Sequence, residues 1–366
     1  MASRETGAVP LTSRGGSVGI KRTCYIIAEA GQNHNGSMKL ARQLIDMTAM
    51  PVMDKAFNTE FRGVNAIKFT KRDMTEELTR DAYDAPYDSE NSYGATYGEH
   101  REKLELSYDE HVELFEHAHG KGLDFVETLT SPKTLALLDR IDVRYIKVAS
   151  RDLTNIPLIT EIARTKRPVI LSTGMEGERE LDRTLDIITG YHTDITILHC
   201  ISQYPAQYHN LNLLSIPYMK ERYPDFTIGY SDHSLGIVAP VVAFALGADV
   251  IEKHITVSHS LKGSDHKGAL EPDGLWRMAR DIRNMEQALG KREKRVPDDI
   301  LPFRHKLERS LATRNPKRAG DTIEEADLVM LSPGGGLGWD DRNRILGRRL
   351  KADIPALTAL EEDMVE

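Results

Sequence analysis

The chain has 366 residues, 40% of them hydrophobic, which suffices for one barrel-sized domain of roughly 250 residues and a smaller one. Its 48 basic and 56 acidic residues give a net charge of −8, so we expect no long-range attraction for nucleic acid or an anionic membrane surface. Residues 1–22 contain no apolar segment of signal-peptide length, and no run reaches the roughly 20 apolar residues of a membrane span. We expect Cys24 and Cys200 to be buried thiols and not to form a disulfide. Together these features predict a cytoplasmic protein with a flexible tail over residues 1–22.

Short apolar runs alternate with segments of helical periodicity up to residue 290, which predicts an α/β fold, a (β/α)8 (TIM) barrel. The eight runs are Tyr25–Ala28, Ala66–Phe69, Asp124–Val126, Tyr145–Val148, Val169–Leu171, Ile195–Leu198, Thr227–Tyr230 and Val250–Ile251. The clearest helical segments are 38–50, 109–122, 132–141 and 275–290. Two connections, 51–63 and 71–107, are unusually long, and the second follows a candidate site residue, where long loops bind substrate or act as lids.

The chain beyond the barrel changes in composition. We expect the barrel over residues 23–290, a charged, proline-bearing linker over 291–308, and a compact unit of short strands and turns over 309–366. The glycine-rich stretch Pro333–Gly338 does not follow the first strand of a βαβ unit, so it predicts turns and not a dinucleotide-binding loop.

Polar residues stand at the C-terminal ends of the predicted strands, where barrel enzymes place their chemistry. They are Glu29, Lys68, Thr128, Lys147, Ser150, Ser172, His199, Ser231, His233, Glu252 and His254. This mixture of carboxylates, lysines, hydroxyls and histidines suits an anionic substrate and a divalent metal.

Two pairs within this set carry the most specific chemistry. His233 and His254 follow neighbouring strands and are close enough in a barrel to share one ion, with manganese favoured if oxygen atoms complete the site; alternatively, each is a hydrogen-bonded structural histidine. Lys68 and Lys147 each end or interrupt an apolar run, which is unfavourable unless the ammonium group meets an anion. That anion is either a ligand or a carboxylate of the chain, Glu29 or Glu252.

Several motifs resemble those of the sialic acid synthase (N-acetylneuraminate synthase) family, in the family's order and spacing. They are Ile27–Gly36, Ala66–Phe69, Lys147–Asn155, Leu171–Met175, His199–Cys200 with Tyr204–Pro205, Gly229–His233, Glu252–His254 and Gly263–His266. The tail from Arg309 resembles the antifreeze-like (SAF) domain that follows the barrel in that family.

The resemblance implies condensation of phosphoenolpyruvate (PEP) with an N-acylmannosamine-type aldose, giving a nine-carbon sialic-acid-like ulosonic acid and phosphate. It implies catalytic roles for Glu29, His233 and His254, and a divalent metal on the two histidines, Mn²⁺ with Mg²⁺ and Co²⁺ as alternatives. PEP would be bound by Lys68, Thr128, Lys147, Ser150, Ser172, Ser202 and Ser231. The sugar would be bound by Glu29, Thr70, Tyr204 and Asp265. It also implies a domain-swapped homodimer whose partners are these two small molecules, and neither nucleic acid nor membrane.

Some positions depart from the family pattern. Thr70 stands where many members have a sugar-contacting glutamine, and Ser332 replaces an arginine that meets the acyl group of the sugar in bacterial members. The segments 92–101 and 262–266 resemble animal-type members, which take a 6-phosphorylated sugar. The alternatives are therefore a pseudaminic or legionaminic acid synthase, or a synthase for a phosphorylated or non-aminated sugar. A non-catalytic sugar-binding barrel is disfavoured, because such a protein needs neither the histidines nor the lysines.

Overall fold

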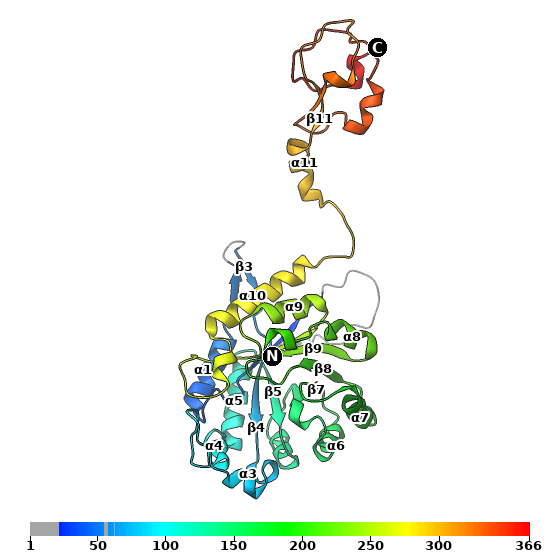
Figure 1. Ribbon diagram of the computed structural model, residues 1–366. Coiled ribbons are helices and arrows are strands. Elements are labelled where there is room, and N and C mark those ends of the chain that lie inside the picture. The colour runs from blue at the N-terminus through cyan, green and yellow to red at the C-terminus, as the bar shows by residue number, and fades with distance from the viewer. Residues whose placement is uncertain (1–21, 55–57, 62) are drawn as a thin grey trace, which may run out of the picture. The chain divides into compact units, whose positions relative to one another are not determined.

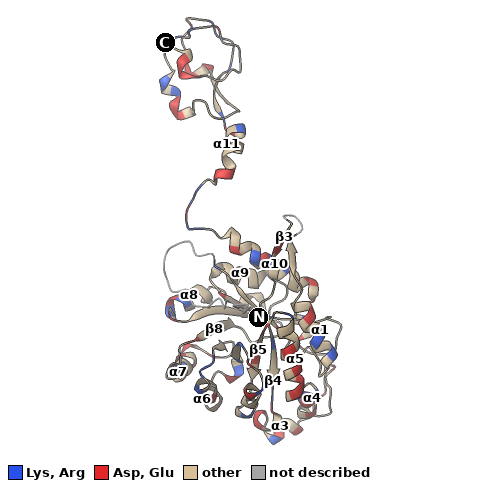
Figure 2. Ribbon diagram, turned by 180° about the vertical axis from the view of Figure 1, so that it is seen from behind, with Lys and Arg blue, Asp and Glu red and all other residues tan. Residues whose placement is uncertain are grey.

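The computed structural model describes residues 22–54, 58–61 and 63–366 (Figure 1). The chain divides into two compact units, Met1–Gly290 and Lys291–Glu366. None of the helices in the described ranges is long and apolar enough to cross a membrane. Figure 2 shows acidic and basic residues interspersed on the outer helices of the first unit, in keeping with the modest net charge of −8.

The first unit is a (β/α)8 barrel, as the sequence predicts. Among the described residues, eight parallel strands close in the order β1-β10-β9-β8-β7-β6-β5-β4. They are β1 (Tyr25–Glu29), β4 (Ala66–Lys71), β5 (Asp124–Leu129), β6 (Tyr145–Val148), β7 (Val169–Ser172), β8 (Ile195–Cys200), β9 (Thr227–Asp232) and β10 (Val250–His254). Most strands run one to three residues further toward their C-terminal ends than predicted. Thr128 and His254, which were predicted to follow their strands, consequently lie within β5 and β10.

Helices form the outer layer of the barrel. The longer ones are α1 (Met38–Thr48), α5 (Tyr108–Gly120), α6 (Ile156–Arg164), α7 (Glu178–Thr189), α8 (Ser215–Arg222), α9 (Val238–Leu246) and α10 (Pro272–Ala288). Ser37 caps α1 by accepting from Leu40 N, as expected from the Asn-Gly-Ser sequence before it. The predicted helix over 132–141 is instead a 3-10 helix, η1 (Pro132–Asp139). Because a 3-10 helix rises about 2.0 Å per residue and an α-helix 1.5 Å, this short connection reaches further along the barrel.

The two long connections carry structure of their own. Within 51–63, β2 (Val52–Asp54) and β3 (Thr59–Phe61) form an antiparallel hairpin. The connection after β4 holds α2 (Met74–Glu77), α3 (Arg80–Asp84) and α4 (Tyr97–Lys103). It is tied to the loop after β10, because Tyr93 OH donates to Lys262 O at 2.8 Å and Gly263 N donates to Asn91 at 3.1 Å. These contacts fix the connection after β4 against the loop after β10.

Cys24 and Cys200 are free and buried, as predicted. Of the segment predicted to be a loose tail, residues 1–21 lie outside the described residues. Arg22 is anchored: its Nε donates to Asp249 at 2.7 Å, and its guanidinium group lies 4.5 Å from the centroid of the Phe244 ring.

The second unit has its own small core. Strands β11 (Ser310–Thr313) and β12 (Leu328–Leu331) pair antiparallel, and the core includes Leu311, Ile345 and Leu360. The region expected to be a linker contains α11 (Leu301–Leu307), and Ser332 Oγ donates to Leu307 O at 3.0 Å. The glycine-rich stretch after Pro333 lies in turns between β12 and the 3-10 helix η7 (Trp339–Arg344), as expected.

A buried ion pair joins β9 to β10 on the outward side of the barrel wall. Lys253 Nζ donates to Asp232 Oδ2 at 2.6 Å, and both side chains are fully enclosed. Asp232 also accepts from Tyr230 OH at 2.8 Å and from Ser234 N at 3.0 Å. Hydrogen bonds from the protein thus replace the water around the Asp232 carboxylate. The desolvation cost of this carboxylate is offset only while the positive charge of Lys253 is present.

We predict that Lys253→Met lowers the free energy of unfolding by about 3–5 kcal/mol, because it leaves Asp232 charged and buried without its cation. Lys220→Met is the control, since Lys220 pairs with the more exposed Asp249 at 2.6 Å and its loss costs about 0–1 kcal/mol. Denaturant unfolding followed by circular dichroism measures both values. Equal losses in the two variants would contradict the prediction.

Candidate active site

A pocket of about 150 Å³ opens at the C-terminal ends of the barrel strands. Every residue to which the resemblance assigns a role in the site lines this pocket. They are Glu29, Lys68, Thr70, Thr128, Lys147, Ser150, Ser172, Ser202, Tyr204, Ser231, His233, His254 and Asp265. Strand alternation explains the convergence, because residues two apart on a strand face the same side.

Four buried charges form the floor of the pocket. In the strand register Glu29 of β1 lies beside Lys68 of β4, and the Lys68 ammonium group contacts the Glu29 carboxylate. Glu252 Oε2 lies 3.7 Å from Lys68 Nζ, and Glu252 Oε1 lies 3.9 Å from Lys147 Nζ. All four side chains are at least 94% buried. Both lysines therefore have carboxylate partners within the chain, which is the alternative that the sequence left open.

The two carboxylates of this cluster differ in acidity. Burial raises the pKa of Glu29 from 4.5 to about 7, helped by the nearby Glu252 charge and only partly opposed by Lys68. For Glu252 burial acts in the same direction, but the positive charges of Lys147 and Lys68 and a hydrogen bond from Ser231 outweigh it and lower the pKa to about 2. Glu29 can consequently exchange a proton near neutral pH, as a general acid or base must.

The two histidines lie together beside this cluster. Their ring centroids are 5.4 Å apart, and the Tyr204 ring lies 4.0 Å from that of His233. His233 Nδ1 donates to Ile201 O at 2.8 Å, which leaves Nε2 with its lone pair free. His254 Nδ1 is buried and has no hydrogen-bond partner. The His233 ring, oriented by a carbonyl group, and the unpartnered His254 nitrogen are suited to serve as ligands of a divalent metal.

Hydroxyl groups line the opposite wall. Ser150 Oγ accepts from Gly174 N at 2.9 Å, whereas Ser172 Oγ is buried without a partner. A Cβ atom at Gly174 would lie 2.4 Å from Ser202 Oγ and 2.9 Å from Ser150 Oγ, so glycine is required for these hydroxyls to converge. An unpartnered buried hydroxyl at this position fits a ligand that supplies oxygen acceptors.

Comparison with known proteins agrees with this geometry. The sequence profile of the NeuB family matches residues 53–294. The chain belongs to the NeuB family. It is 33% identical to the N,N'-diacetyllegionaminic acid synthase of Legionella pneumophila, over 95% of this chain and 96% of the relative. It is 33% identical to the N-acetylneuraminate-9-phosphate synthase of Mus musculus, over 95% and 94%. The crystal structure of the sialic acid synthetase from Leptospira borgpetersenii, a complex with citrate, superimposes with a TM-score of 0.63 at 32% identity, covering 77% of this chain and 90% of that one.

This NeuB-family protein is thus an enzyme of the sialic acid synthase type, which excludes a purely sugar-binding barrel. The histidine His199 does not share the site: its Nε2 donates to Leu211 O at 2.7 Å, which is a structural role. The roles of the pocket residues remain predictions.

Sequence reasoning missed several residues that line the pocket of this NeuB-family enzyme. Glu252 was recognised as a possible partner of the lysines but was given no part in binding or catalysis, although it lies between the two lysines. Arg72 and Arg151 were overlooked. Strand alternation through Lys68 and Thr70 would have found Arg72, whereas Arg151 enters from a 3-10 helix and leaves no such pattern.

We predict that Glu29→Gln changes the pH dependence of stability in metal-free protein. Between its ordinary pKa of 4.5 and the folded value of about 7, the folded chain holds a proton that the unfolded chain has lost. The wild type should therefore lose stability relative to Glu29→Gln as pH rises from 5 to 8, by on the order of 1–3 kcal/mol.

Glu252→Gln serves as the comparison, since the lowered pKa of Glu252 contributes stability that is present above pH 4.5 and lost only as pH falls toward 2. The difference between wild type and this variant should be flat from pH 5 to 8. Unfolding free energies at pH 5, 6.5 and 8 measure both trends, and a flat difference for Glu29→Gln would contradict the raised pKa.

Proposed function

We propose that the enzyme condenses PEP with an N-acylmannosamine-type aldose, giving a nine-carbon ulosonic acid and phosphate. The observation that supports this most strongly is the pair of buried lysines at the floor of the pocket, next to an unpartnered hydroxyl and two imidazoles. A single anion site beside an electrophile-activating site suits a reaction that joins an anionic nucleophile to a carbonyl compound.

PEP would occupy the floor of the pocket. Its carboxylate and phosphate would meet Lys68 and Lys147, together with hydroxyls of Thr128, Ser150, Ser172, Ser202 and Ser231. Lys68 Nζ already donates to Thr128 Oγ1 at 3.0 Å, and Ser231 Oγ donates to Glu252 at 2.9 Å. Donors that are fixed before the ligand arrives stabilise developing charge without reorganising. PEP has to compete with Glu29 for Lys68, so the binding of PEP releases the Glu29 carboxylate.

The chemistry requires one bond between carbons and one loss of phosphate. C3 of PEP forms a bond to the aldehyde carbon of the open-chain sugar, and the aldehyde oxygen takes up a proton to become a hydroxyl. Water adds to C2 and gives up a proton, for which Glu29 is the acceptor. The bond between C2 and the phosphate oxygen then breaks, and phosphate leaves with the proton of the C2 hydroxyl, which becomes the keto group. A pKa near 7 suits Glu29 for taking and returning the proton of the water.

A divalent metal, Mn²⁺ with Mg²⁺ and Co²⁺ as alternatives, would be held by His233 and His254. When bound it would polarise the aldehyde oxygen as a Lewis acid. Tyr204, Asp265 and Thr70 would position the sugar, and Glu29 would also contact it. The enzyme would act as a domain-swapped homodimer in which the second unit, the SAF-like domain, closes a neighbouring active site.

Phosphate release tests the proposed reaction. We expect release when the purified protein is incubated with PEP, Mn²⁺ and N-acetylmannosamine or a related aldose, and a product with the mass of the nine-carbon acid. Exhaustive chelation should abolish turnover and leave the circular dichroism spectrum unchanged, and Mn²⁺ should restore it. Omission of the sugar is the control. Release of phosphate without sugar, or full activity after chelation, would overturn the proposal.

We predict that Lys147→Ala weakens PEP binding by tens-fold or more, with far less effect on sugar affinity. Loss of one partner of a buried charge interaction costs about 2–5 kcal/mol. Lys133→Ala is the control, since Lys133 is about half exposed and pairs with Glu76 at 3.8 Å away from the pocket. Titration calorimetry with PEP, and separately with the sugar, measures both affinities. Equal losses for the two ligands would identify Lys147 as a structural residue.

A further inference from the structure

Three arginines converge on one carboxylate beside the outer part of the pocket. Glu77 Oε1 lies 2.8 Å from Arg72 Nη1, 2.8 Å from Arg151 Nη2 and 3.4 Å from Arg101 Nη2. The other oxygen of Glu77 accepts from Thr130 Oγ1 at 3.2 Å. A single carboxylate oxygen is thus shared by three guanidinium groups.

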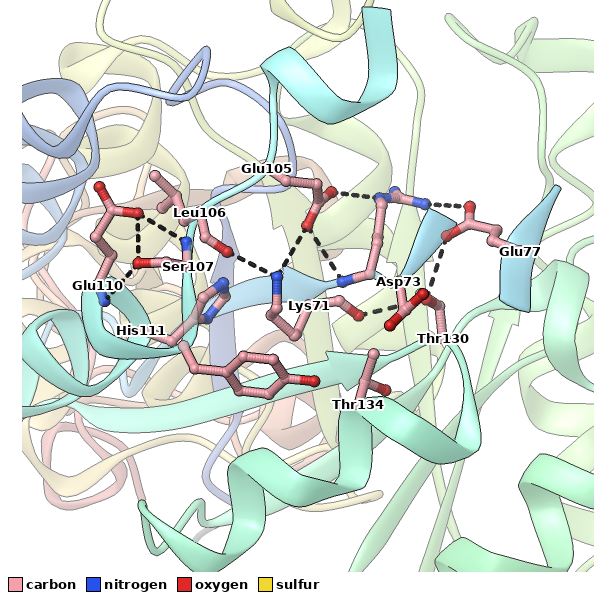
Figure 3. A network of polar contacts seen from close by, with 12 residues as sticks. Lys71, Asp73, Glu77, Glu105, Leu106, Ser107, Glu110, His111, Thr130 and Thr134 are labelled. Carbon is pink, nitrogen blue, oxygen red and sulfur yellow. Dashed lines mark hydrogen bonds and ion pairs between the residues drawn. The ribbon is translucent and has the colours of Figure 1, made fainter. Parts of the chain in front are cut away.

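Lys71 and further carboxylates surround this arginine cluster. Figure 3 shows the neighbouring network, in which Lys71 reaches Leu106 O and Glu105 while Thr130 contacts Glu77. Glu105 also lies 3.4 Å from Arg72 Nε. Arg151 Nε donates to Asp152 at 3.4 Å. In these contacts within the described part of the chain, Lys71 and the three arginines share three carboxylates, and Asp73 adds a negative charge near Lys71.

The pKa values of Arg72 and Glu77 reflect the close approach of the three positive charges. The pKa of Arg72 is lowered from 12.5 to about 10 by burial and by the charges of Arg101 and Arg151. The pKa of Glu77 is lowered although burial acts against this, because Arg72, Arg151 and Arg101 surround it. A second anion would relieve this repulsion.

Hydrogen-bond donors in the cluster are only partly satisfied. Arg72 Nε is buried, and its 3.4 Å contact with Glu105 lacks hydrogen-bond geometry. Gln32 accepts from Arg101 Nη1 at 2.9 Å, while its own Nε2 is buried without an acceptor. Arg72, Arg151 and Gln32 line the pocket, and Glu77 lies behind the two arginines. An oxyanion in the pocket would meet donors that the chain itself does not satisfy.

The position of the cluster in the barrel relates it to the substrate. Lys68, Thr70 and Arg72 are alternate residues along and just beyond β4, so Arg72 lies about 13 Å above Lys68 at 3.3 Å per residue. Arg72 and Arg151 follow β4 and β6, whereas His233 and His254 lie at β9 and β10, which are separated from them around the closed barrel. A sugar with its aldehyde at the histidines extends its other end toward the arginines.

We propose that Arg72 and Arg151 bind an anionic group, a phosphate or a carboxylate, on the end of the sugar remote from its aldehyde. This inference rests on the proposed function. It adds that the sugar is negatively charged and that Arg72 and Arg151 recognise this charge. Guanidinium groups suit both anions, since each presents paired oxygens to a planar fork of donors. Glu77 holds the two arginines in place and leaves their outer donors to the ligand.

Three sugars test the inference: N-acetylmannosamine, its 6-phosphate, and the 6-carboxylate N-acetylmannosaminuronate. We expect the wild type to show a kcat/KM at least about tenfold higher for one anionic sugar than for the neutral sugar, equal to ~1.4 kcal/mol. Arg151→Ala should reduce this preference by about tenfold through KM, and Arg151→Lys should restore part of it. Arg179→Ala is the control, because Arg179 is 93% exposed and pairs only locally with Glu180.

The outcomes separate this inference from the proposed function. Equal kcat/KM values for the three sugars in the wild type, or equal losses for all three in Arg151→Ala, overturn the inference while phosphate release upholds the reaction. If phosphate is released with none of the sugars, the proposed reaction fails. The affinities of the same three sugars, measured by calorimetry, then test the inference, and at least about tenfold tighter binding of one anionic sugar than of the neutral sugar supports it. The better anionic sugar identifies whether phosphate or carboxylate is bound.

Discussion

The four buried charges at the floor of the barrel are the constraint on which the site depends. Burying charge is unfavourable unless every charge has a partner in good geometry. Glu29, Lys68, Lys147 and Glu252 meet this condition only when β1 lies between β10 and β4, that is, when the barrel is closed. Closure of the sheet and assembly of the anion site are therefore one event. In the proposed reaction, the substrate anion competes with Glu29 and Glu252 for cations that the fold already holds.

The pocket divides by strand into regions with different chemistry. Lysines and hydroxyls lie at the floor, imidazoles at β9 and β10, and arginines above β4 and β6. Each region retains polar atoms that the chain does not satisfy, among them Ser172 Oγ, His254 Nδ1 and Gln32 Nε2. Unsatisfied buried groups are uncommon in folded proteins. Those that line this pocket lie where a bound ligand would supply the missing partners.

The two units differ in how they are stabilised. The barrel combines a large apolar core with buried ion pairs such as Lys253 and Asp232, whereas the second unit relies on a small apolar core around Leu311 and Leu360. Ser332 makes a local contact to Leu307. In the proposed mode of binding, the sugar meets positive charge on the barrel residues Arg72 and Arg151.

The sequence alone determined the barrel and its eight strands, because strand periodicity and strand ends are local properties. Together with the family resemblance it also identified most of the polar residues that line the pocket, but not Arg72 and Arg151. It did not determine that Pro132–Asp139 forms a 3-10 helix, since the length of a connection depends on the distance it must span. Only the tertiary structure decided the partners of the charges. Glu252 acquires its strongly lowered pKa, and Arg151 its place beside Glu77, from residues far away in the chain. Electrostatic interactions act through space, so residues that are distant in the sequence determine the pKa values and the ion pairs of the site.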